Sequence, residues 1–161
     1  MPVQEEVIPY LLGVNNDVVA LAQTGTGKTA AYGLPVLQKV DATRNVTQAL
    51  ILSPTRELCL QIADDLENYS KYLPGVRVLP VYGGANIEPQ IRTLRKGVQV
   101  IVATPGRLID LMERGALRWS MWKTWCWTKP TRCFPWGSRR VSTRFWPGCP
   151  KTITHCSSLP R

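Results

Sequence analysis

Short runs of apolar, β-branched residues alternate with helical patterns along the first 118 residues, and this alternation limits the folds open to the chain. The runs span residues 17–22, 49–53, 76–81 and 98–103. Their length and their Val, Ile and Leu content are typical of parallel strands buried on both faces. Helical spacing occupies residues 55–72, 88–95 and 106–114, and a helix opening at residues 29–32 meets Gly33 and Pro35, which we expect to interrupt it. The pattern predicts a doubly wound α/β sheet with flanking helices.

A glycine-rich loop follows the first predicted strand. Residues 22–29 read Ala-Gln-Thr-Gly-Thr-Gly-Lys-Thr, which fits a phosphate-binding P-loop. Gly25 and Gly27 let backbone N–H groups converge on phosphate oxygens, and the next helix directs its positive N-terminus to the same anion. Lys28 supplies charge to the outer phosphates, and the Thr29 hydroxyl is a ligand for Mg²⁺. The loop therefore predicts a nucleotide site beyond the carboxyl end of its strand.

Three further segments follow the other predicted strands. They read Ser-Pro-Thr-Arg-Glu-Leu at residues 53–58, Tyr-Gly-Gly at residues 82–84 and Ala-Thr-Pro-Gly-Arg at residues 103–107. Taken singly, each is explained by a helix cap or a tight turn. Taken together, they place helix-end N–H groups, paired glycines and two arginines at the edge of the sheet where ligands bind.

The four segments together resemble the motifs of the DEAD-box family of ATP-dependent RNA helicases. AQTGTGKT resembles motif I, PTREL motif Ia, Gly83-Gly84 the GG motif and TPGR motif Ib, while residues 2–4 resemble the end of the Q motif, whose Gln reads the adenine edge. The order and spacing also match, and the resemblance covers residues 2–117. Other P-loop families would explain the phosphate loop but not the remaining segments.

The resemblance implies a RecA-like P-loop domain that binds ATP with Mg²⁺ and holds RNA by its backbone, without sequence preference. It assigns the nucleotide to Gln4, Ala22, Gln23, Thr24, Gly25, Thr26, Gly27, Lys28 and Thr29. Lys28 and Thr29 are the catalytic candidates, and Thr29 is the candidate metal ligand. It assigns RNA to Pro54, Thr55, Arg56, Glu57, Gly83, Gly84, Thr104, Pro105, Gly106 and Arg107.

The composition changes abruptly after Arg118. All 11 acidic residues precede that point, whereas residues 119–161 contain 8 of the 20 Lys and Arg, all 6 Trp, 4 of the 5 Cys and the only His. We therefore divide the chain into a partial RecA-like, ATP-binding domain over residues 1–118 and a basic Trp- and Cys-rich tail over residues 119–161. The domain is incomplete, since the acidic and Ser-Ala-Thr motifs that the family places after TPGR are missing.

Three explanations for the tail compete. The first is a basic aromatic arm that binds nucleic acid, the second is a small Cys-rich module, and the third is coding sequence translated out of frame. The second is disfavoured because the cysteines form no C-x-x-C pair and only one His accompanies them, so zinc ligands are lacking.

The genetic code favours the frameshift. When the last base of each codon is joined to the first two bases of the next, the joins from Trp125 to Thr128 force Val, Leu and Asp. The next joins permit Glu, Ala and Asp, and those from Cys156 to Arg161 permit Leu-Phe-Ser-Ala-Thr. Both missing motifs thus reappear in order. We expect the tail to be irregular and poorly ordered, because prolines such as Pro130, Pro135, Pro147 and Pro150 suit strands badly.

These observations define two candidate functions. The family function is ATP-dependent RNA unwinding, but the chain as written lacks the acidic residues, so we expect no helicase activity and negligible ATPase activity. The alternative is a non-enzymatic RNA-binding fragment that uses the basic aromatic tail. We expect no membrane association and a cytoplasmic location, because apolar runs are short and residues 1–118 hold a single cysteine, Cys59.

The frameshift makes a prediction about the DNA. Resequencing the codons for residues 114–122 should reveal a missing or extra base, because the in-frame motifs are lost from about residue 115 onward. An uninterrupted frame across these codons would contradict the hypothesis.

Overall fold

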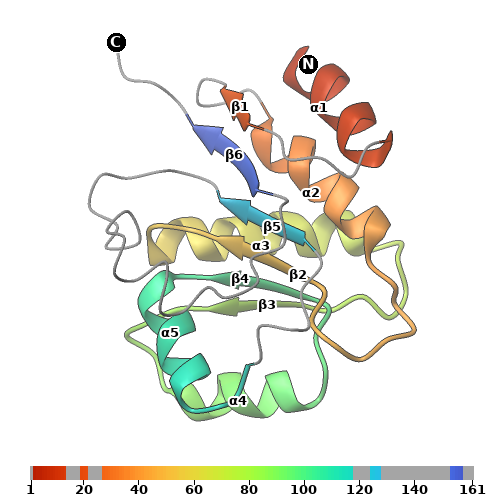
Figure 1. Ribbon diagram of the computed structural model, residues 1–161. Coiled ribbons are helices and arrows are strands. Elements are labelled where there is room, and N and C mark those ends of the chain that lie inside the picture. Colours follow the sequence, from red (N-terminus) through yellow and green to blue (C-terminus); the bar gives the residue numbers. More distant parts are fainter. Residues whose placement is uncertain (1, 14–18, 22–26, 118–123, 128–152, 158–161) are drawn as a thin grey trace.

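Six strands form one parallel sheet in the computed structural model, which describes residues 2–13, 19–21, 27–117, 124–127 and 153–157 (Figure 1). The spatial order is β1-β6-β5-β2-β4-β3. The first four strands lie within the four predicted apolar runs, so the predicted α/β sheet is confirmed. The strands are β1 (Val19–Leu21), β2 (Ala49–Leu52), β3 (Val78–Val81), β4 (Val100–Ala103), β5 (Thr124–Trp127) and β6 (Ile153–Ser157).

Helices connect and cover the strands. Three of them, α3 (Arg56–Ser70), α4 (Ile87–Arg95) and α5 (Pro105–Glu113), lie where helical spacing predicts them. The other two are α1 (Pro2–Gly13) and α2 (Lys28–Lys39). The sequence analysis did not predict α1, which contains Pro9 and buries only Val7 and Leu11, so its apolar periodicity is weak.

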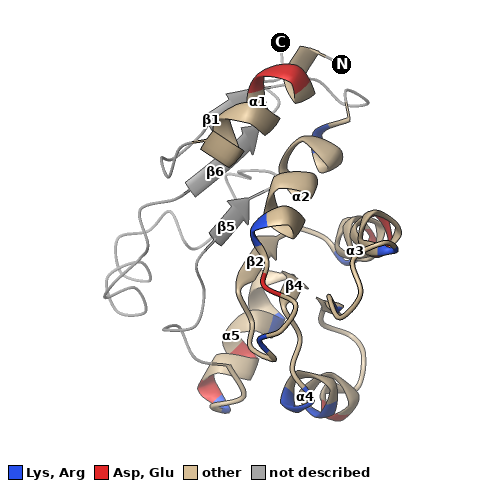
Figure 2. Ribbon diagram, turned by 90° about the vertical axis from the view of Figure 1, so that its right-hand side faces the viewer, with Lys and Arg blue, Asp and Glu red and all other residues tan. Residues whose placement is uncertain are grey.

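The two faces of the sheet bury different side chains. Ala49 and Ile51 of β2 belong to a core with residues of α1, α2 and α3, whereas Leu50 and Leu52 belong to a core with residues of α4 and α5. Figure 2 shows α3 on one side of the strands and α5 on the other. Since successive strand residues point to opposite faces, both faces of β2 are covered, as a doubly wound sheet requires.

Helix α2 corrects one expectation, because it continues through Gly33 and Pro35. A Cβ at Gly33 would lie 2.8 Å from Cδ2 of Leu66, so the glycine allows α2 to pack closely against α3. Proline inside a helix costs about 3 kcal/mol. Burial of the neighbouring Tyr32, Val36 and Leu37 offsets that cost, since fully burying one such side chain contributes about 1.5–3 kcal/mol.

Strands β5 and β6 correct another expectation. Their residues belong to the tail that we expected to be irregular, yet β5 pairs with β2, and β6 pairs with both β1 and β5. The four prolines that argued against strands lie outside both segments. Trp, Ile and Thr favour strands, and pairing satisfies backbone groups along β1 and β2. The other tail residues, 119–123, 128–152 and 158–161, lie outside the described part of the chain.

The strand order separates the phosphate loop from the segment at residues 53–58. Strands β6 and β5 lie between β1, which leads into the phosphate loop, and β2, which leads into the segment at residues 53–58. Three steps between neighbouring strands amount to about 14 Å. In the described part of the chain, no helix is long and apolar enough to span a membrane.

Candidate nucleotide and nucleic-acid site

Three of the predicted segments meet at the carboxyl edge of the sheet. The register pairs Leu52 with Ala103 and Ala103 with Val81, so β2, β4 and β3 end at the same level. The amide of Ser53 donates a hydrogen bond to the Ala103 carbonyl at 2.9 Å, and the amide of Thr104 donates to the Val81 carbonyl at 2.8 Å. These bonds continue the ladder one residue beyond the strands and fix the starts of all three segments side by side.

The segment at residues 53–58 forms the N-terminus of α3. The Thr55 hydroxyl accepts a hydrogen bond from the Leu58 amide at 3.3 Å, and the Ser53 hydroxyl donates to the Thr55 carbonyl at 3.1 Å. Thr55 is therefore the helix cap, as its residue type favours. Arg56 and Glu57 are exposed in the first turn of the helix, next to its positive end.

Arg56 joins this segment to the glycine pair. Its guanidinium carbon lies 4.7 Å from the centre of the Tyr82 ring, which is a cation–π distance. Gly83 and Gly84 follow as exposed residues, and Gly84 has a φ of +80° that favours glycine. A Cβ on Gly84 would lie 3.6 Å from Nη1 of Arg56, so the loop and the guanidinium are neighbours.

The segment at residues 103–107 forms the N-terminus of α5. Thr104 occupies the cap position, Pro105 begins the helix and Gly106 is exposed. The Arg107 side chain is only 11% exposed. Its Nη2 donates to the Ala85 carbonyl at 2.8 Å, and its Nη1 donates to Oε1 of Gln90 at 3.2 Å. The structure therefore commits this guanidinium to contacts inside the protein.

Gln90 is a site neighbour that the sequence analysis missed. It is 8% exposed, and its Nε2 donates to the Tyr82 carbonyl at 3.3 Å. The available signal was its position on α4, because Ile87, Ile91 and Leu94 pack into the core at helical spacing around it. A glutamine within an apolar stripe requires buried hydrogen-bond partners, and here these are Arg107 and Tyr82.

The nucleotide segment is described from Gly27 onward. Gly27 caps α2 with a φ of 70°, and its carbonyl accepts a hydrogen bond from Nε2 of Gln4 at 3.1 Å. The structure thus brings Gln4 of α1 to the end of the phosphate loop. Lys28 and Thr29 are half-buried in the first turn of α2. The predicted ligands Ala22, Gln23, Thr24, Gly25 and Thr26 lie outside the described residues.

The site is poor in metal ligands. The described residues contain no group of three His, Cys, Asp or Glu side chains that could hold a metal ion. The register pairs Leu52 with Trp127, so β5 ends at the same edge of the sheet as the site. In the sequence, Thr128, Lys129, Pro130 and Thr131 come next, and the whole of residues 119–161 contains no carboxylate side chain.

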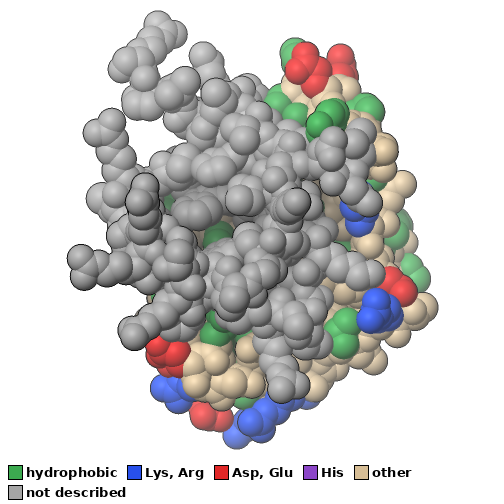
Figure 3. Space-filling model, in the orientation of Figure 1, with side chains coloured by type: hydrophobic (Ala, Val, Ile, Leu, Met, Phe, Trp, Pro, Cys, Tyr) green, Lys and Arg blue, Asp and Glu red, His purple; other side chains and the backbone are tan. Residues whose placement is uncertain are grey.

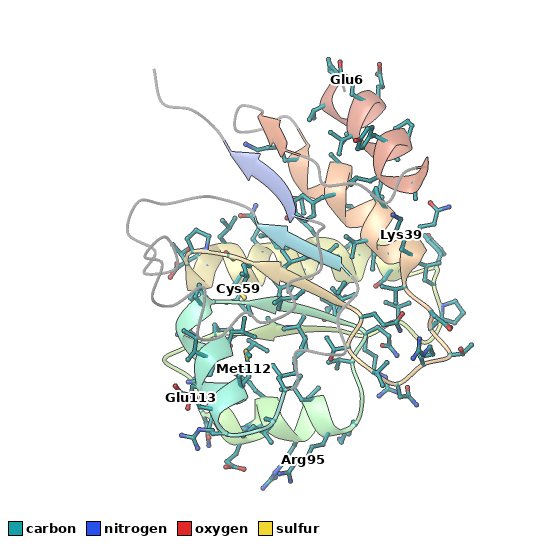
Figure 4. The ribbon with its side chains drawn as sticks, in the orientation of Figure 1. Glu6, Lys39, Cys59, Arg95, Met112 and Glu113 are labelled. Atoms are coloured by element: carbon teal, nitrogen blue, oxygen red, sulfur yellow. The ribbon has the colours of Figure 1, made fainter. Side chains whose placement is uncertain are left out.

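Cys59 lies behind the site between α3 and the sheet. Its side chain is fully buried, and Sγ lies 3.1 Å from the Val102 carbonyl and 4.0 Å from the Val81 carbonyl (Figure 4). Burial raises the pKa of the thiol from 9.0 to about 11, against a smaller lowering by the hydrogen bond to Val81. Cys59 is therefore a neutral packing residue.

Comparison with known proteins identifies the family. Residues 1–124 match the DEAD/DEAH box helicase family, so the chain belongs to it. The chain is 53% identical over 115 residues to the ATP-dependent RNA helicase DeaD of Mycobacterium tuberculosis (strain H37Rv), a match that covers 71% of this chain and 20% of that protein. It is 49% identical over 116 residues to DeaD of Escherichia coli (strain K12), covering 72% of this chain and 18% of that one.

Solved structures give the same assignment. A hypothetical ATP-dependent RNA helicase from Sulfolobus tokodaii has a TM-score of 0.80 at 32% identity, with 98% of this chain and 45% of that chain covered. A DEAD box protein from Methanococcus jannaschii has a TM-score of 0.79 at 31% identity, with 99% and 44% covered. The chain thus has the fold of a partial RecA-like DEAD-box domain and spans about a fifth of the bacterial relatives.

The pKa of Cys59 gives a prediction. The thiolate is the reactive form, so at a pH of about 8 the folded chain should react with iodoacetamide about a hundredfold more slowly at Cys59 than the urea-unfolded chain does. Mass spectrometry of the Cys59 peptide measures the labelling, and equal rates in both states would contradict the burial.

The same pKa shift affects stability. Between pH 9.0 and about 11 the unfolded thiol ionises first, so the contribution of this group to stability is complete below that window and falls as the pH rises through it.

Proposed function

We propose that residues 1–118 are the ATP- and RNA-backbone-binding part of a DEAD-box ATP-dependent RNA helicase. The observation that carries this proposal is the meeting of three segments, each predicted to bind an anion, at one sheet edge, joined by the Ser53–Ala103 and Thr104–Val81 hydrogen bonds. The names of the bacterial relatives, which are ATP-dependent RNA helicases, support the same function. Because the chain covers about a fifth of those proteins, unwinding is the activity of the whole helicase.

ATP would be held by the phosphate loop and α1. The sequence of the loop at residues 22–27 and the N-terminus of α2 would supply backbone N–H groups to the phosphates, and Lys28 would add a positive charge. The Thr29 hydroxyl would be a ligand for Mg²⁺, which neutralises phosphate charge when bound. Gln4, whose amide already lies at the loop, would read the adenine edge.

RNA would be held by its phosphates along the edge formed by β2, β4 and β3. Thr55, Arg56, Glu57, Gly83, Gly84 and Gly106 are exposed there, and Pro54 and Thr104 are half-buried beside them. Two helix N-termini and a glycine loop present neutral N–H donors, whereas Arg56 presents a charge. Such contacts recognise the backbone and carry little sequence information, so we propose binding without sequence preference.

Hydrolysis would be absent from this chain. Residues 119–161, where the family's acidic motif would fall, contain no carboxylate side chain, so this segment supplies no group that completes the Mg²⁺ site or orients the attacking water. We attribute this loss to the frame change in the tail, residues 119–161. A protein with this reduced complement would bind ATP and RNA in the cytoplasm without unwinding.

Lys28 provides the test of ATP binding. Lys28→Ala should weaken ATP binding by about tenfold or more, because it removes a charge-assisted hydrogen bond to phosphate. Lys39→Ala is the matched control, since Lys39 is an exposed lysine in the last turn of the same helix (Figure 4). Isothermal titration calorimetry measures both variants. Equal affinities for the two variants, or ATP hydrolysis by the unmodified chain that RNA stimulates severalfold, would overturn the proposal.

Arg56 separates binding at the sheet edge from binding by the basic tail. Arg56→Ala should weaken binding of a fluorescein-labelled oligouridine and reduce the slope of log affinity against log salt by about 0.7, the value for one phosphate contact. Arg95→Ala is the control, because Arg95 is exposed on α4, away from Cys59 and the sheet (Figure 4). If both variants bind as the unmodified chain does, the eight tail cations carry the binding and the alternative function holds.

A further inference from the structure

A chain of partly buried hydrogen bonds flanks the exposed glycine pair on both sides. The Tyr82 carbonyl, just before Gly83, accepts from Nε2 of Gln90 at 3.3 Å. The Ala85 carbonyl, just after Gly84, accepts from Nη2 of Arg107 at 2.8 Å. The two donors are themselves joined, because Nη1 of Arg107 donates to Oε1 of Gln90 at 3.2 Å.

The chemistry of these groups allows only one arrangement. A guanidinium only donates and a backbone carbonyl only accepts, so Gln90 must turn its oxygen to Arg107 and its nitrogen to Tyr82. No other residue type of this length supplies an acceptor and a neutral donor at once. Gln90 is 8% exposed, and leaving its amide unpaired would be costly, which makes the arrangement rigid.

Arg107 is poorly placed to bind phosphate. Its side chain is 11% exposed, and Nε lies 3.9 Å from Oδ2 of Asp110, so a carboxylate already accompanies the charge. Arg56 differs, since it is exposed and stacks on the Tyr82 ring. The two arginines therefore have different geometries although both lie in anion-binding segments.

We propose that Gln90 and Arg107 are positioning residues that hold the Gly83-Gly84 loop open for the RNA backbone, and that Arg107 does not itself bind phosphate. The proposal rests on the proposed function only for the identity of the ligand. These hydrogen bonds of Gln90 and Arg107, which we call the brace, join α4, α5 and the end of β3. They fix the backbone on both sides of two glycines, which have no side chains of their own to order them. Without it, the loop must be ordered at the moment of binding, which lowers affinity.

Hydrogen exchange on the full chain tests the brace without RNA. Gln90→Met and Arg107→Met remove the polar atoms at similar length, and each should speed exchange of the amides at residues 83–86 by about fivefold or more. Gln90→Glu retains the oxygen that Arg107 contacts and should raise exchange less than Gln90→Met. Amides of α3 should be unchanged, and Arg95→Met, on the exposed side of α4, should leave the loop unchanged. Unaltered exchange in both Met variants would overturn the proposal.

The salt dependence of oligouridine binding tests the second part of the proposal, namely that Arg107 does not itself bind phosphate. Both Met variants should weaken binding to a similar extent while keeping the salt slope of the unmodified chain, because the loop amides are neutral. A slope lowered by about 0.7 in Arg107→Met alone would mean that Arg107 binds phosphate, and would refute its positioning role. If exchange rises as expected but RNA affinity is unchanged, the brace exists and the proposed RNA function of the loop fails.

Discussion

The site depends on the common level at which the parallel strands β2, β4 and β3 end. Each strand contributes one segment with little chemistry of its own, such as a helix cap or a pair of glycines. The pairing of Leu52 with Ala103 and of Ala103 with Val81 brings these segments together. Burial on both faces fixes that register, because a shift by one residue would exchange the side chains that face α3 for those that face α5.

Few charged side chains are exposed along the edge formed by the ends of β2, β4 and β3. Arg56 is exposed, whereas Arg107 is directed inward, and most of the remaining donors are backbone N–H groups. Other cations lie elsewhere, as the Lys and Arg side chains at the lower end of the space-filling view show, where α4 lies (Figure 3). With mostly neutral donors, the proposed binding of an RNA backbone would depend on geometry, so the loops at this edge would have to be ordered before the ligand arrives.

The sequence was sufficient for β1 to β4, which are short runs of apolar, β-branched residues, and for α3, α4 and α5, whose apolar residues recur at helical spacing. It was misleading at Gly33, where glycine serves close packing against Leu66 rather than a helix end. It was also misleading in the tail, where prolines between the strands hid the pairing of residues 124–127 and 153–157. For the site, cap and glycine positions were predictable from spacing. The inward direction of the Arg107 side chain could not be predicted, because it depends on a hydrogen bond to Gln90. That residue belongs to a different helix and approaches Arg107 only in the folded chain.

The strand order also governs how the molecule assembles. Strands β2, β3 and β4 are joined by short helical connections and pair with one another, so they form a locally connected unit. Among the strands that the structure describes, β1 pairs only with β6, which lies far from it along the sequence. Closing so long a loop is entropically costly and slow. The half formed by β2, β3 and β4 is thus positioned to fold early during synthesis, whereas β1 gains its partner only after the residues of β6 have been synthesised.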